Sequence, residues 1–75
     1  MSDEITTLMN SNQGKRVTLK LRNNRVIQGN LKNFDVHMNL TLEDAEDVTD
    51  TPSKIGSVLL RGDNILAISL PDPSK

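Results

Sequence analysis

The chain has 75 residues, no cysteine and one histidine, and its formal net charge at pH 7 is -1. This length allows one small domain. The lack of cysteine excludes disulfides and thiolate metal sites, and a lone histidine among scattered carboxylates provides no metal-ligand spacing, so we expect neither a metal nor another cofactor. A core of this size rarely contributes more than about 3–5 kcal/mol, which leaves self-association as the way to stabilise the fold.

The chain carries no signal for a membrane. Its N-terminus has no basic segment followed by an apolar one, and no apolar run approaches the roughly 20 residues that a membrane helix needs. We therefore expect a soluble, cytoplasmic protein with no membrane contact.

Charged residues are segregated along the chain. Basic residues dominate up to Phe34, whereas every charged residue from Asp35 to Asp50 is acidic. This pattern predicts either one basic and one acidic surface on the folded protein, or ion pairs between neighbouring strands. The sequence alone leaves both alternatives open.

A short amphipathic helix is predicted over residues 3–12. Ile5, Leu8 and Met9 are spaced three and four residues apart and form an apolar stripe. Gly14 supplies a stop just beyond the end of the helix. A helix of this length is not stable alone, so we expect it to pack on a sheet.

Five strands are predicted after the helix, over residues 16–21, 25–34, 38–48, 55–60 and 65–70. Asn23 and Asn24 form the first turn, where asparagine tolerates the left-handed backbone conformation. Gly29, inside the second strand, predicts a bulge or a sharp bend. Bent strands let a small antiparallel sheet curl into a barrel. Residues 71–75 are predicted to be a frayed tail.

The third predicted strand combines apolar alternation with polar side chains. Strand geometry places Met38, Leu40 and Leu42 on the core face. The only histidine, His37, then lies beside Asn39 on the opposite face. These two polar side chains are the first half of a candidate binding site.

A second compact polar cluster, residues 61–64 (RGDN), separates the last two strands. Our hypothesis is that the fold brings this cluster to His37 and Asn39 and so makes a small pocket for a nucleobase. Asp35 is predicted to organise the loop before the third strand through hydrogen bonds to the backbone.

The chemistry of these side chains suits a base from single-stranded RNA, which proteins recognise by stacking and by hydrogen bonds to the base edge. The ring of His37 and the guanidinium of Arg61 can sandwich a base. The amide of Asn39 carries a donor and an acceptor, which complements uracil but not cytosine. Asp63 is predicted to fix the direction of that amide, and the backbone of Gly62 to approach the base closely.

The last two strands are apolar on both faces, in contrast to the first. Val58, Leu59 and Leu60 are followed by Ile65 and Leu66 and by further apolar residues. Such edge strands are a hazard in a monomer, whereas pairing of unlike edges between identical copies can close a ring. We expect a partner subunit to cover one face; the alternative is an ordinary buried strand pair in a monomer.

The sequence resembles the Sm-like (LSm) family, in particular its archaeal type. The two halves of the Sm motif are matched at Gly29, Asp35, Met38 and Asn39, within GNLKNFDVHMNLTLEDAE, and at Arg61, Gly62 and Asp63, within LLRGDNI. The resemblance covers nearly the whole chain, and the two halves together are far more specific than either alone. The pair Asn23-Asn24 departs from the glycine that the family often has in this turn.

The resemblance implies the Sm fold, which is a mainly β small open barrel with a short N-terminal helix on a strongly bent five-stranded antiparallel sheet, as a single domain over residues 1–75. It implies homo-oligomeric rings, most often heptamers, closed by pairing the fourth strand of one subunit with the fifth of the next. It also implies binding of single-stranded, uridine-rich RNA at the central pore, in RNA processing or ribonucleoprotein assembly.

The residues that match the family's uridine pocket are His37, Asn39, Arg61, Gly62 and Asp63. Bacterial Hfq-type rings are hexameric relatives with a different second motif half, so the RGD-type turn argues against that branch.

Two other functions compete with RNA binding. An enzyme would need a nucleophile or an acid–base pair, and no cysteine, suitably spaced serine or paired carboxylate accompanies the histidine, so we expect no catalysis. A ring that only scaffolds other proteins would leave the pocket idle. A preference for oligo(U) over oligo(C) distinguishes RNA recognition from both.

Overall fold

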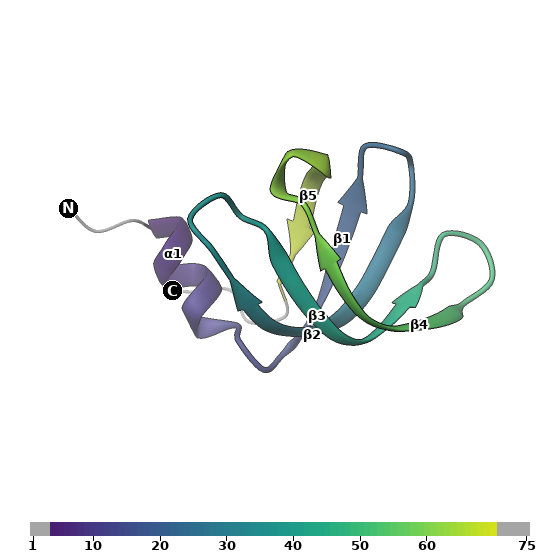
Figure 1. The fold of residues 1–75 in the computed structure, drawn as a ribbon, viewed down its shortest axis with the longest axis horizontal. Helices are drawn as coiled ribbons and strands as arrows, with labels where there is room; N and C mark the ends of the chain where they lie inside the picture. The colour runs from purple at the N-terminus through teal and green to yellow at the C-terminus, as the bar shows by residue number, and fades with distance from the viewer. Residues whose placement is uncertain (1–3, 71–75) are drawn as a thin grey trace.

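The computed structural model describes residues 4–70, which form a short helix and a strongly bent five-stranded sheet (Figure 1). In chain order the elements are α1 (Glu4–Ser11), β1 (Arg16–Leu21), β2 (Val26–Phe34), β3 (Leu40–Asp47), β4 (Ser53–Leu60), the 3₁₀ turn η1 (Gly62–Asn64) and β5 (Ile65–Ser69). Antiparallel neighbours follow the order β4-β3-β2-β1-β5, so β4 and β5 are the two edges of the sheet. The predicted fold class is confirmed; the predicted tail, residues 71–75, lies outside the described residues.

The core lies inside the bend of the sheet. Alternate side chains of the three inner strands are buried there together with one side chain of α1: Met9, Val17, Leu19, Leu21, Ile27, Leu31, Leu40, Leu42 and Ala45. Asn12 follows the helix and is also buried, and its Nδ2 donates to the carbonyl oxygen of Leu8 (2.9 Å). This bond satisfies one of the carbonyl groups that a helix end leaves free. Met9 of α1 is part of the buried core, so α1 packs on the sheet as predicted.

Gly29 marks a bend in β2. The register between β2 and β3 shifts between Gln28 and Asn30, on either side of this glycine. A Cβ at position 29 would lie 3.0 Å from the Cβ of Leu42 and 3.1 Å from the Cβ of Ala45. The predicted irregularity is confirmed, and its physical reason is the close approach of β3 to the backbone of β2.

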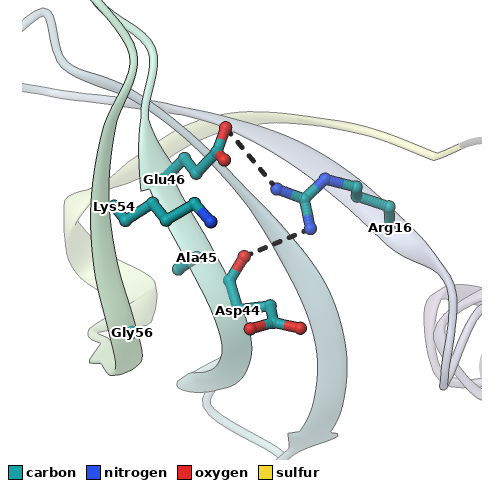
Figure 2. Close-up of a pocket in the computed structure, with 6 residues that line it drawn as sticks. All are labelled: Arg16, Asp44, Ala45, Glu46, Lys54 and Gly56. Atoms are coloured by element: carbon teal, nitrogen blue, oxygen red, sulfur yellow. Dashed lines mark hydrogen bonds and ion pairs between the residues drawn. The ribbon is translucent and has the colours of Figure 1, made fainter.

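Oppositely charged side chains from different parts of the chain form ion pairs across the sheet. The pairs that join the basic first part of the chain to its acidic middle are Arg16–Glu46 (3.8 Å), Arg25–Asp47 (2.7 Å) and Lys32–Glu43 (3.1 Å). Figure 2 shows Arg16 extending toward β3, where its Nη1 also donates to the carbonyl oxygen of Asp44 (3.2 Å). Of the two alternatives that the sequence allowed, the structure contains the ion pairs. Ion pairs at the surface add little to stability.

The two edge strands keep apolar side chains at the surface. Leu59 of β4 is 69% exposed and Leu66 of β5 is 53% exposed. A groove of about 460 Å³ beside β5 is lined mainly by apolar side chains, including Leu8 and Met9 of α1. As predicted, the described part of the chain does not cover these strands by itself.

The β1–β2 turn uses asparagine in the left-handed region. Asn24 has a φ of 68°, and its N–H donates to the carbonyl oxygen of Leu21 (3.1 Å). Oδ1 of Asn23 accepts the N–H of Arg25 (3.1 Å). The departure from the family's glycine is therefore accommodated, because asparagine adopts this conformation more readily than other side-chain-bearing residues.

We expect Asn24→Ala to lower the free energy of unfolding by about 1 kcal/mol, because alanine in the left-handed region lacks the local hydrogen bonds that asparagine can form. Asn24→Gly should keep the stability of the unmodified protein. Urea unfolding at one fixed protein concentration measures both, since association would otherwise shift the midpoint. Equal stability of the alanine and asparagine forms would contradict this account of the turn.

Candidate functional site

The loop between β2 and β3 is a turn built around the carboxylate of Asp35. Its Oδ1 accepts the backbone N–H groups of His37 (2.9 Å) and Asn39 (3.0 Å), and its Oδ2 accepts the side-chain Nδ2 of Asn39 (3.0 Å). The N–H of Met38 donates to the carbonyl oxygen of Asp35 (2.9 Å), which closes the turn. The prediction that Asp35 organises this loop is confirmed. We refer to residues 35–39 as the first site turn.

These hydrogen bonds favour the charged form of Asp35. The backbone N–H of Asn39 is the largest cause that holds the pKa of this carboxyl below its ordinary value. The Asn39 amide, the backbone N–H of His37 and the charge of the His37 ring act in the same direction, whereas desolvation opposes them. The ionised carboxylate is therefore the form that supports the turn.

The prediction that a strand runs from residue 38 is wrong at its start. Met38 has a φ of 62°, in the left-handed region that strands do not contain, and β3 begins only at Leu40. His37 and Asn39 are thus directed by the Asp35 turn and not by alternation along a strand. The side chain of Met38 is half-buried and packs against the core, so its predicted core position is confirmed only in part.

The turn of residues 61–64, the second site turn, contacts the first one directly. The N–H of Gly62 donates to Oδ1 of Asn39 (2.8 Å). A Cβ at position 62 would overlap the carbonyl oxygen of His37 and lie 2.9 Å from the carbonyl carbon of Met38. Glycine is needed here for contact between the two turns, and its N–H is already used within the protein. The close approach of the Gly62 backbone to a base remains a prediction.

The direction of the Asn39 amide is fixed from both ends. Its Nδ2 faces the carboxylate of Asp35, which only accepts, and its Oδ1 faces the N–H of Gly62, which only donates. Rotating the amide by half a turn would oppose like groups at both contacts. The predicted role of Asp63 in this orientation is wrong: its Oδ1 lies 3.4 Å from Nε of Arg61 instead. Asp63 therefore acts on the direction of the guanidinium.

The two polar clusters form one pocket. An open cavity of about 470 Å³ is lined by His37, Asn39, Arg61 and Asp63. The side chains of Arg61 and Asp63 are 78% and 73% exposed, so their groups face solvent and a ligand can reach them. The hypothesis that the fold brings the two clusters together is confirmed; the binding of RNA by these residues remains a prediction.

Sequence reasoning missed one contributor to this pocket. The sequence predicts only that Asp35 organises the loop, yet its carboxylate also sets the direction of the Asn39 side chain. The sequence signal for this contact is the spacing of four residues between Asp35 and Asn39. That spacing indicates a hydrogen bond between the two side chains only if the chain between them forms a turn.

Residues 4–70 contain neither a membrane-spanning helix nor a metal-binding cluster. No helix there is long and apolar enough to cross a membrane. No group of three or more histidine, aspartate or glutamate side chains in the same segment is arranged to hold a metal ion.

The contribution of Asp35 to the free energy of unfolding should depend on pH. Its pKa in the folded protein lies below the unfolded value, so its stabilising effect is complete above the ordinary carboxyl pKa and is lost as pH falls through the lowered folded value. We expect Asp35→Asn to reduce stability at about pH 7 and to flatten the loss of stability below about pH 4. Urea unfolding at a series of pH values measures this.

Asp47 gives the matched comparison for the acid experiment. The pKa of Asp47 is lowered, chiefly by its hydrogen bond with the hydroxyl of Thr49. Asp47 should therefore also cause some loss of stability at low pH, and this part of the loss should remain in Asp35→Asn. Superimposable pH profiles for the unmodified protein and Asp35→Asn would show that Asp35 does not stabilise the first site turn.

Known proteins resemble this chain in both sequence and structure. The family model for the LSM domain matches residues 7–70. The putative snRNP Sm-like protein of Methanosarcina barkeri is 37% identical over 71 residues, which are 92% of this chain and 99% of that protein.

Solved structures give the same relationship. The P. aerophilum SmAP1 heptamer matches with a TM-score of 0.89 and 38% identity, over 97% of this chain and 100% of that one. The Sm protein of Pyrococcus abyssii, solved in complex with a uridine heptamer, matches with a TM-score of 0.80 and 31% identity, over 92% of this chain and 99% of that one.

Proposed function

The chain belongs to the LSM domain family, and from this we propose that it is a ring subunit that binds single-stranded, uridine-rich RNA at the central pore. Its relatives include a protein that forms a heptamer and one that was solved with a uridine heptamer. The observation that carries the proposal is the Asn39 amide, held in one orientation within a pocket that also contains a flat ring and a guanidinium. The ring would act in RNA processing or ribonucleoprotein assembly, and the proposal includes a cytoplasmic location.

Base selection follows from the locked amide. An amide group has two N–H donors and two acceptor lone pairs, and Asp35 and Gly62 use one of each on Asn39. One donor and one acceptor remain for a ligand, in a fixed order. Uracil offers an N3–H beside a carbonyl oxygen and fits this order. Cytosine in the same position would direct the lone pair of its N3 at Oδ1, so the two acceptors would repel each other.

Stacking holds the base in place. The ring of His37 and the guanidinium of Arg61 belong to different turns and line the same pocket, so a base can enter between them. The contact between Arg61 and Asp63 restrains the guanidinium. Stacking of this kind contributes about 1–3 kcal/mol per base, which alone corresponds to binding weaker than millimolar.

A ring of identical subunits provides the missing affinity. The free edge of β4 in one subunit pairs with the free edge of β5 in the next, and this covers the exposed Leu59 and Leu66. The contact joins unlike surfaces, so it repeats from subunit to subunit and closes into a ring when the rotation between subunits suits; we expect a homoheptamer. Linked sites on one RNA strand raise binding by about 10²–10⁴ without new contacts in each subunit.

We expect the pocket to bind RNA without catalysing a reaction on it. The side chains that accompany His37 are an amide, a guanidinium and a carboxylate that contacts that guanidinium, so the pocket offers no hydroxyl or thiol as nucleophile. We therefore expect bound RNA to be released intact.

The test is retention of labelled oligo(U) and oligo(C) by the protein at rising salt concentration. We expect a clear preference for oligo(U), and at least about a tenfold loss of oligo(U) affinity in His37→Ala or Asn39→Ala, because each ring loses stacking or edge recognition at every site. Light scattering should show that both variants still form rings.

Lys32→Ala is the matched control, because Lys32 is an exposed cation on β2 that pairs with Glu43 outside the pocket. It should leave the preference for oligo(U) intact. Equal retention of the two oligonucleotides by the unmodified protein, or full oligo(U) binding by both pocket variants, would refute the assignment.

A further inference from the structure

Arg22 connects the β1–β2 turn to the second site turn. Its backbone N–H donates to the carbonyl oxygen of Asn64 (2.9 Å), and its side-chain Nε donates to the carbonyl oxygen of Asp63 (2.7 Å). The second site turn is therefore held by two parts of the chain, by Asn39 through Gly62 and by Arg22 through Asp63 and Asn64.

The positive charge of Arg22 is not compensated. Both of its acceptors are neutral carbonyl groups, and within residues 4–70 no carboxylate lies within ion-pair distance of it. By contrast, four other cations each have a carboxylate partner: Arg16, Arg25, Lys32 and Arg61. Only Nε of the Arg22 side chain is used, so the four N–H groups on its terminal nitrogens have no partner among the described residues.

The pocket itself has little charge to offer a phosphate. Arg61 lies against Asp63, so these two charges largely cancel. A bound nucleotide nevertheless carries a negative phosphate close to its base. Arg22 is the uncompensated cation that is fastened to the same turn as Arg61, and its planar guanidinium suits the bidentate geometry of phosphate oxygens.

We propose that Arg22 is the phosphate-binding cation of the uridine site. Its Nε positions the second site turn, and its terminal nitrogens contact the backbone phosphate of the bound nucleotide. This assignment rests on the proposed function, because it requires RNA in the pocket. It separates two tasks: the amide of Asn39 selects the base, while Arg22 supplies attraction that does not depend on sequence.

The test compares Arg22→Gln with Lys20→Gln. Glutamine removes the charge of Arg22 but keeps an N–H donor for the carbonyl of Asp63. Lys20 is exposed on β1, two residues before Arg22, and has no hydrogen bond or ion pair with either site turn, so its substitution controls for net charge. The affinity for a uridine heptanucleotide and for a cytidine heptanucleotide is measured over a series of salt concentrations.

We expect Arg22→Gln to reduce the slope of log K against log salt by about 0.7 for each phosphate contact that is lost. It should weaken binding of both oligonucleotides by the same factor, so the preference for uridine stays unchanged. Lys20→Gln should retain the original slope, and Arg22→Lys, which restores a cation, should recover most of it.

An unchanged slope in Arg22→Gln would overturn the proposal, whether or not affinity falls, because a purely structural role changes affinity without changing the number of released counterions. A slope that falls equally in Lys20→Gln would also overturn it, since general charge would then explain the effect. Failure of the proposed function is recognised separately: the unmodified protein would then show no preference for uridine, and Asn39→Ala would change nothing.

Discussion

The hydrogen bond from the N–H of Gly62 to Oδ1 of Asn39 joins two turns that are far apart in the sequence. The meeting of the two site turns in one pocket depends on it. It fixes one end of the Asn39 amide, and Asp35 fixes the other end with a carboxylate that also shapes the first site turn. Because no side chain fits between the turns at position 62, this contact is a packing constraint as well as a polar one.

The sheet brings these turns to one place. Both flank strands that bend around the core, with Gly29 allowing β3 to approach β2. The same topology leaves β4 and β5 as free edges with exposed leucines, so the feature that builds the pocket also gives the subunit two surfaces for its neighbours. A weak single-base site then becomes useful because the ring repeats it.

Much of the fold could be predicted from the sequence. The alternation in residues 16–21 gave a strand with the observed bounds, and the residues flanking Gly29 show the predicted irregularity. The stretch around Met38 was predicted wrongly, because its apolar spacing mimics a strand while the Asp35 carboxylate imposes a left-handed turn. The pairing of Asp63 with Arg61, and of Asp35 with Asn39, depends on local backbone geometry that residue spacing does not encode.

The most direct test of the central claim is a crystal structure of this protein with a uridine heptanucleotide. It should show a closed ring in which each uracil lies between His37 and Arg61, with its N3–H directed at Oδ1 of Asn39 while that oxygen still accepts the N–H of Gly62. A ring that binds the RNA with the Asn39 amide turned away from the bases, or a subunit that binds it without a ring, would contradict the account.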